Sequence, residues 1–292
     1  MATEPLQADV YVAPVIPAAT GDSDPNKRLW SPISCTLIQG PTSAVIVDTP
    51  INIQQTTDLA DWIAKTAPRK KLTHLFITHV HGDHFFGAPV LQKRFPGIQI
   101  VSTAKVAGGI KEQYGDAYTT LWSVLFPNGQ LPEEKPLASS LPASNEFTLD
   151  GYKLHAIDVP HSDCEHSSVL HVPSLDLVVG GDVIYGDCYQ FLGQANTHEK
   201  RQQWIDALTM IEELNPKIVV AGHKRASQID GPYLLQATKK YIQVFERECE
   251  RLKGEGQEGE EGATALEKRM KELYPQRWNE WILKQSCLSA FA

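Results

Sequence analysis

Four side chains that bind metal ions well lie within six residues, in the run His79-Val80-His81-Gly82-Asp83-His84. In a tight loop, residues two apart can point the same way, so His79 and His81 can share one metal ion. Asp83 and His84 can then present an oxygen and a nitrogen to a second ion beside it. Zinc and similar divalent metals accept this mixture of imidazole and carboxylate. The run therefore predicts a two-metal site, and the alternative is a histidine-rich surface turn without metal.

Three distant residues support the metal interpretation. His161, Asp182 and His223 each stand just past an apolar, strand-like segment. The ends of such strands are where an α/β sheet exposes its functional site. Two metal ions about 3.5–4 Å apart can hold a bridging hydroxide and stabilise a developing oxyanion, which is chemistry suited to hydrolysis.

The elements that must position these residues can be read from apolar patterning. Strands are expected at 44–48, 72–78, 98–101, 152–159, 168–172, 175–179 and 217–221. Helices are expected at 56–65, 90–95, 196–214 with Asn196 as its N-cap, from Pro232 onward, and at 263–283. Strands flanked by helices in both halves predict a layered α/β fold.

The chain divides into three predicted parts. Residues 1–253 form one hydrolase domain, in which the aromatic and proline-rich excursion 110–145 is expected to cover the site. The acidic, glycine-rich stretch 254–262 is expected to be a mobile loop. Residues 263–292 are expected to form a C-terminal helical segment.

The ordered set of residues resembles the metallo-β-lactamase superfamily over about 32–223. Thr78 to His84 match the family's T-H-x-H-x-D-H motif, and the later single His, Asp and His correspond to His161, Asp182 and His223. The resemblance implies a four-layer αββα sandwich with extra C-terminal helices and its site at one edge.

Two Zn²⁺ per chain are implied as well, although other divalent metals fit the same ligands. One ion would take His79, His81 and His161, and the other Asp83, His84 and His223, with Asp182 bridging both. Asp48, at the end of an early strand, would support the ligands from behind. Asp83 would also be the catalytic group that orients the nucleophile.

The chain departs from the family pattern at two places. Phe86 stands where the family often has the first of two glycines after the motif, and Pro160-His161-Ser162-Asp163 replaces the usual glycine-rich turn around the third ligand. Candidate substrate contacts are Phe86, Trp122, Tyr185, His198 and Lys224. The roles of His166, Cys164 and Cys188 stay open between site and structure.

The composition of the chain limits the classes of molecule that it is expected to bind. A formal net charge of -8 disfavours a nucleic-acid binder, which usually has a basic face. Five cysteines without a C-x-x-C pair favour reduced thiols, and neither a signal peptide nor a membrane span is predicted, so we expect a cytoplasmic protein. The expected partner is a small-molecule substrate, without nucleic acid or membrane, and an oligomer is compatible with the sequence.

The predicted function is that of a zinc-dependent hydrolase using a metal-bridged hydroxide to open an amide or ester, above all a cyclic lactam or lactone. Such a lactamase or lactonase could detoxify a xenobiotic or secondary metabolite. The alternative is a thioesterase similar to glyoxalase II. A nuclease and a mono-iron redox enzyme of the same fold are favoured less.

Overall fold

The computed structural model describes residues 5–292 and contains two main β-sheets packed face to face. The first sheet comprises, in spatial order, β1 (Gln7–Ala13), β4 (Ile33–Gln39), β5 (Ser43–Val47), β6 (Lys71–Phe76), β7 (Gln99–Ser102) and β8 (Ser139–Ser140). The second comprises β13 (Ile218–Val220), β12 (Leu177–Val179), β11 (Ser168–Val172), β10 (Tyr152–Asp158) and β9 (Glu146–Leu149). A small separate sheet pairs β2 (Ile16–Pro17) with β3 (Leu29–Trp30).

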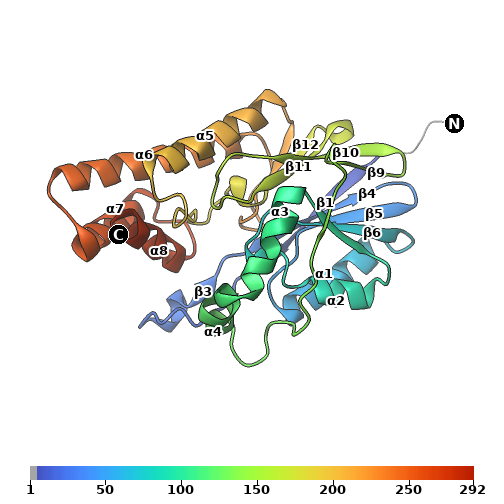
Figure 1. Cartoon of the computed structure of the whole chain (residues 1–292), viewed down its shortest axis with the longest axis horizontal. Helices are drawn as coiled ribbons and strands as arrows, with labels where there is room; N and C mark the ends of the chain where they lie inside the picture. The colour runs from blue at the N-terminus through green and yellow to red at the C-terminus, as the bar shows by residue number, and fades with distance from the viewer. Residues whose placement is uncertain (1–4) are drawn as a thin grey trace.

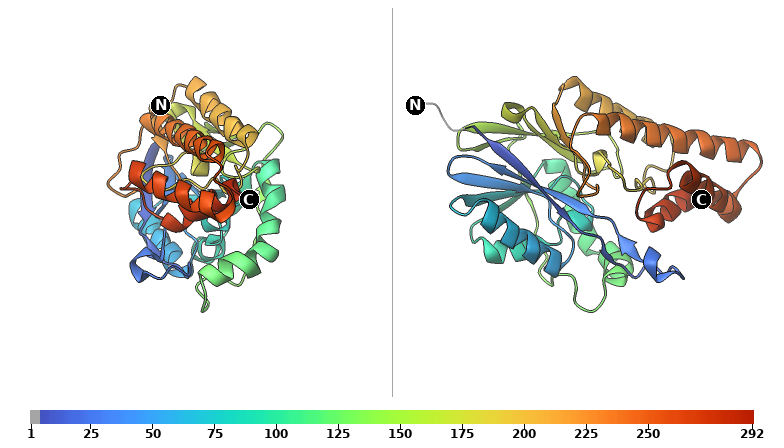
Figure 2. Two further views of the ribbon diagram at one scale, coloured as in Figure 1. Left: turned by 90° about the vertical axis from the view of Figure 1, so that its left-hand side faces the viewer. Right: turned by 180° about the vertical axis from the view of Figure 1, so that it is seen from behind.

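Helices cover the outer faces of both sheets, which makes the four-layer αββα arrangement (Figures 1 and 2). The α-helices are α1 (Ile53–Thr66), α2 (Ala88–Arg94), α3 (Ala104–Gly109), α4 (Ser123–Leu125), α5 (His198–Glu213), α6 (Tyr233–Gly254), α7 (Gly259–Leu273) and α8 (Glu280–Ala290). Short helical turns are η1 (Pro25–Lys27), η2 (Gly82–His84), η3 (Ile110–Tyr114), the π-helical η4 (Tyr118–Trp122), η5 (Pro173–Leu175) and η6 (Gly181–Val183).

The alternation of apolar side chains along the strands explains the layering. On β5, Val45 and Val47 point into the core between the sheets, whereas Ala44 and Ile46 face the helical side. On β12, Val178 likewise faces away from the inter-sheet core. Successive strand residues point to opposite faces, so a strand that is apolar throughout needs cover on both sides. The sandwich provides that cover.

Most predicted elements are confirmed, and β11 has the predicted bounds. The strands β1 and β4 have no counterpart among the predictions. β4 is buried throughout, yet Ser34, Thr36 and Gln39 interrupt its apolar pattern and conceal it in the sequence. The predicted N-cap Asn196 is wrong: Thr197 caps α5, accepting a hydrogen bond from the backbone of Lys200.

The C-terminal predictions require two corrections. The predicted loop 254–262 shrinks to residues 255–258, because α6 runs through Gly254 and α7 begins at Gly259. The predicted helix 263–283 is two helices, since Pro275 follows the end of α7 and the chain turns at Asn279 before α8. The helices α7 and α8 pack beside α6 (Figure 1).

Candidate metal centre

Four loops bring the predicted metal ligands to one edge of the sandwich. The histidine run follows β6, Asp182 lies in η6 after β12, and His223 follows β13. The loop between β10 and β11 contributes residues 159–167. Backbone bridges join His79 to Ser167 and Tyr185 to His223, so the loops hold one another in place.

Asp48 fixes the start of the histidine run. Its Oδ1 accepts a hydrogen bond from the backbone N–H of Thr78 at 2.8 Å, and its Oδ2 accepts one from the Thr78 hydroxyl at 2.7 Å. The same Oδ2 lies 3.0 Å from Nδ1 of His84, which orients the other ring nitrogen of His84 toward the site. Asp48 is a non-glycine residue with φ of 60°, and strained backbone of this kind often accompanies a functional site. Asp48 thus lies directly behind His84 and the start of the histidine run.

One group of ligand atoms consists of Asp83, His84 and His223, whose donor atoms lie within 4.8 Å of one another. Asp182 stands directly beside it: its Oδ1 is 3.1 Å from Nε2 of His84, and its Oδ2 is 3.3 Å from Nε2 of His223. The far nitrogen of His223, Nδ1, contacts the carbonyl oxygen of Pro32 at 2.8 Å. The ring orientations are thus set by contacts away from the site.

The second group consists of His79, His81 and Asp163, again with donor atoms within 4.8 Å. The predicted ligand His161 does not belong to it. Its Nδ1 contacts the carbonyl oxygen of the adjacent Ser162 at 2.8 Å, while the Asp163 carboxylate takes the place beside the two histidines.

Nε2 of His79 is buried and has no hydrogen-bond partner within the described chain. Oδ2 of Asp163 and Oδ1 of Asp182 are also buried and lie 2.8 Å and 3.1 Å from ring nitrogens of His81 and His84. A buried polar atom without a partner is costly unless an ion satisfies it. The two groups of imidazole and carboxylate donors are the ligand types that divalent metals prefer. The residues therefore fit bound metal ions.

Without a metal ion, the carboxylates and histidines of the site shift one another's pKa values. Burial alone would raise the pKa of Asp83, but the hydrogen bond from His223 and the charges of His84 and His223 lower it to about 2. Burial would lower the pKa of His84, yet the Asp182 charge and hydrogen bonds to Asp182 and Asp48 raise it to about 10. Burial would likewise raise the pKa of Asp163, but His79 and His81 lower it. Ionised buried carboxylates require nearby cations, either protonated histidines or metal ions.

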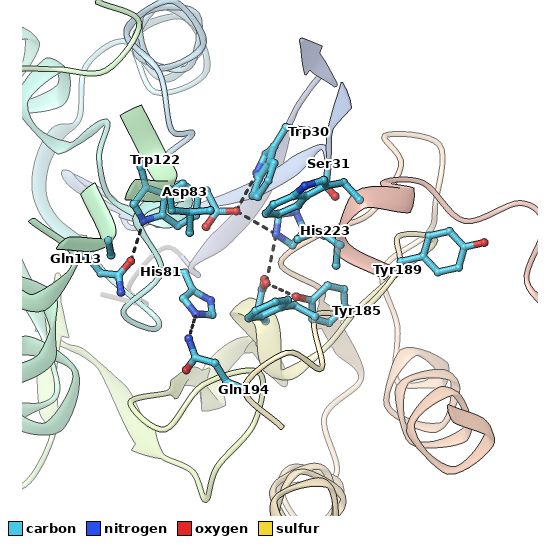
Figure 3. A pocket seen from close by; sticks show the side chains of 16 residues that line it. Trp30, Ser31, His81, Asp83, Gln113, Trp122, Tyr185, Tyr189, Gln194 and His223 are labelled. Carbon is cyan, nitrogen blue, oxygen red and sulfur yellow. Dashed lines mark hydrogen bonds and ion pairs between the residues drawn. The ribbon is translucent and has the colours of Figure 1, made fainter. Parts of the chain in front are cut away.

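A cavity of about 150 Å³ opens directly onto these groups. His81, Asp83 and His223 line it (Figure 3), together with Asp182. Its walls are largely apolar and aromatic, and they are formed by Trp30, Ala117, Leu121, Trp122, Tyr185, Tyr189, Phe191, Trp281 and Ile282. Ser31, Gln113 and Gln194 complete the lining. Such a cavity, mostly apolar with a few convergent polar groups, is typical of a small-molecule site.

Two of the five predicted substrate contacts line this cavity. The indole of Trp122 donates a hydrogen bond to Gln113 at 2.9 Å, and the hydroxyl of Tyr185 donates one to Asp182. Both rings are therefore held in place from within the site.

The structure places the other three predicted substrate contacts away from this cavity. Phe86 is buried behind the cavity wall, where it stacks on Tyr114. His198 begins α5 on the surface and contacts Glu246. Lys224 is buried, but its ammonium turns away and pairs with Asp230 at 2.9 Å. None of the three lines the cavity.

Important residues also escaped the sequence analysis. Asp163 could have been noticed only as a carboxylate near a predicted ligand. Trp30 donates a hydrogen bond from its indole to Oδ2 of Asp83 at 3.0 Å, and no local sequence pattern marked it. Trp281 and Ile282 reach the cavity from α8, beyond the predicted domain.

The residues left open take mainly structural positions. Cys164 is buried against the hydroxyl of Ser167, and Cys188 is buried in a backbone bridge to Trp278. His166 packs beside Gly109, and neither it nor the cysteines line the cavity. Within residues 5–292, no helix is both long and apolar enough to cross a membrane.

Comparisons with known proteins agree with the fold. A family model described as the metallo-beta-lactamase superfamily matches residues 28–223. A metallo-beta-lactamase from Pontibacter korlensis superposes with a TM-score of 0.57 at 16% identity, covering 83% of this chain and 97% of that chain. FIM-1 from Pseudomonas aeruginosa, in a mono-zinc form, gives a TM-score of 0.54 at 16% identity, covering 84% of this chain and 93% of that one.

An enzyme from Hirschia baltica gives a TM-score of 0.54 at 17% identity, covering 82% of this chain and 93% of that chain. No curated protein matches the sequence significantly.

Proposed function

Because the chain belongs to the metallo-beta-lactamase superfamily, we propose that it is a metal-dependent hydrolase that opens a cyclic ester or amide in a small, uncharged and largely apolar substrate. One observation carries the substrate class: the cavity above the ligand groups has aromatic and aliphatic walls. Among its lining residues, all within the described chain, there is no lysine or arginine. The walls around the metal positions therefore offer a substrate carboxylate no lysine or arginine partner.

The roles of the residues follow from their contacts. When bound, divalent ions lower the pKa of water toward 7 and polarise a carbonyl oxygen. Trp30 holds one oxygen of Asp83, which fixes the carboxylate in the cavity lining. From there Asp83 can orient an attacking water and transfer its proton toward the leaving nitrogen or oxygen. Tyr185 holds Asp182, and the apolar walls orient the substrate and exclude bulk water.

The cavity disfavours the alternative functions. A glutathione thioester of the glyoxalase II type carries carboxylates, and a nucleic acid carries phosphates. Both would need cationic residues, whereas the candidate Lys224 is paired with Asp230. The ligand groups also offer more donors than a mono-iron site would need. Uncharged lactones and lactams remain the class that the walls fit best.

A substrate panel tests this proposal. Protein loaded with zinc or manganese should hydrolyse uncharged lactones or lactams. Its kcat/KM for them should be at least tenfold higher than its kcat/KM for matched compounds that bear a carboxylate. Neutral thioesters of the same size belong in the panel. Equal or better turnover of the carboxylates, a preference for thioesters, or no turnover of any member would contradict the proposal.

Shortening Leu121 should weaken substrate binding. Leu121 lines the cavity from η4, and Leu121→Ala removes apolar surface that an apolar substrate would cover. At about 25 cal/mol per Å² we expect a loss of about 1–1.5 kcal/mol, or about tenfold in kcat/KM, mainly through KM. Val124→Ala is the matched control, because Val124 lies nearby but is 54% exposed and outside the cavity lining. Equal effects of both substitutions would argue against this substrate position.

A further inference from the structure

We propose that Asp163, not His161, completes the metal-binding group of His79 and His81. The inference rests on the proposed function only in requiring that the chain bind a divalent metal. It changes the ligand set implied by family resemblance, because a carboxylate replaces the third imidazole.

The two oxygens of Asp163 have different surroundings. Its Oδ1 accepts hydrogen bonds from the hydroxyls of Ser162 at 3.0 Å and Ser167 at 3.4 Å. Its Oδ2 faces the two histidines and lies 2.8 Å from Nδ1 of His81 and 3.6 Å from Nε2 of His79. The carboxylate side chain is fully buried. One oxygen thus anchors the group while the other points at two histidine nitrogens, as expected for a preorganised ligand.

The turn around Asp163 places its carboxylate, rather than the His161 ring, beside His79 and His81. The backbone N–H of Ser162 donates to the carbonyl oxygen of Cys164 at 3.0 Å, which closes a tight turn over this loop. The Cys164 side chain is buried against Ser167. Within this turn, Oδ2 of Asp163 reaches Nδ1 of His81, whereas His161 joins no two site ligands in a group whose donor atoms all lie within 4.8 Å of one another.

The substitution has a chemical consequence. With Asp163, three carboxylates rather than two face the metal positions, the others being Asp83 and Asp182. They would offset three of the four positive charges of two divalent ions. Harder ions such as Mn²⁺ prefer a carboxylate oxygen to an imidazole nitrogen as a ligand. We therefore expect weaker discrimination for Zn²⁺ over Mn²⁺ than a three-histidine site would show.

Metal binding by purified variants tests the assignment without relying on activity. Metal-free wild type, Asp163→Asn and His161→Asn are titrated with Zn²⁺, Mn²⁺ and Co²⁺, and bound metal is measured by elemental analysis and calorimetry. Asp163→Asn should lower the affinity for one metal equivalent at least about 100-fold and alter the visible Co²⁺ spectrum. His161→Asn should stay within about threefold of wild type. Circular dichroism and Tm of the metal-free proteins confirm that the variants are folded.

Two further variants separate ligation from a structural role. Ser167→Ala removes a hydrogen bond to Oδ1 but keeps the carboxylate, so it should retain the metal. Asp163→His should regain Zn²⁺ relative to Asp163→Asn and shift the preference from Mn²⁺ toward Zn²⁺. If His161→Asn lost metal binding while Asp163→Asn kept it, this inference would be overturned and the proposed function would stand. A wild-type chain that binds no divalent metal would overturn the proposed function as well.

Discussion

Replacing Asp182 by asparagine should lower kcat/KM by about 1,000-fold, or about 4 kcal/mol in transition-state stabilisation. The side chain keeps its size, so the fold should persist, but the charge between His84 and His223 disappears. In the structure the two Asp182 oxygens lie 3.1 Å and 3.3 Å from the Nε2 atoms of these histidines. Among residues 5–292, Asp182 is the one carboxylate that lies within 4 Å of the Nε2 atoms of both histidines. An amide in this position would bind a cation far less well, so bound metal should fall together with activity.

The control for this variant is Tyr185→Phe. It removes the hydroxyl that donates to Asp182 but leaves the carboxylate charged. We expect a loss of tenfold or less in kcat/KM and little change in metal content. Steady-state kinetics at several metal concentrations, with elemental analysis of the same samples, measure both effects. Asp182→Asn protein that retains activity within tenfold of wild type would place the essential charge elsewhere.

The part of the site that follows from the sequence is the part carried by strand ends. The apolar runs expected at 72–78, 175–179 and 217–221 correspond to strands that end at Phe76, Val179 and Val220. The polar residues just beyond them converge because those strands end at one edge. The ligands at 79–84 are close together in the sequence. Their spacing alone therefore indicates which of these side chains can bind the same metal ion. Strands that are apolar on both faces need cover on both sides, which also predicts the layered sandwich.

The part that does not follow depends on the direction of single side chains in loops. His161 and Asp163 are two residues apart, and only the turn closed by Ser162 and Cys164 decides which of them faces His79. The cavity walls are a further example. Trp30 and Trp281 lie far apart in the sequence, yet their rings contact each other with centroids 5.7 Å apart. No local pattern predicts such a pair.

The C-terminal helices belong to the site although the sequence separates them from it. Asn279 donates a hydrogen bond to the hydroxyl of Ser31 at 3.0 Å, and Ser286 accepts one from the backbone of Leu192 at 2.9 Å. These contacts fasten α8 to the segments that line the cavity. Trp281 and Ile282 then complete the wall from α8. The helices therefore shape substrate choice under the proposed function.

Gly222 should be as sensitive to substitution as a ligand, although it carries no side chain. It lies between β13 and His223, and its N–H donates to the carbonyl oxygens of Gly181 at 2.9 Å and Ile184 at 3.1 Å. A Cβ atom here would stand 2.2 Å from Oδ1 of Asp182 and 2.6 Å from the carbonyl carbon of Gly181. The obstacles are backbone and a buried carboxylate, so neither can yield without moving the site.

Gly222→Ala should therefore displace Asp182 or His223, lowering kcat/KM at least about 100-fold together with metal affinity. Overpacking of this kind costs about 1–3 kcal/mol, so we expect Tm to fall by about 2–10 °C. Gly108→Ala is the matched control, since Gly108 is exposed near the end of α3 and a Cβ there meets nothing within 4 Å. That change should leave activity unaltered and Tm equal or slightly higher, because alanine favours a helix. Wild-type metal affinity in Gly222→Ala would show that the backbone at 181 and 222 can separate without disturbing the ligands.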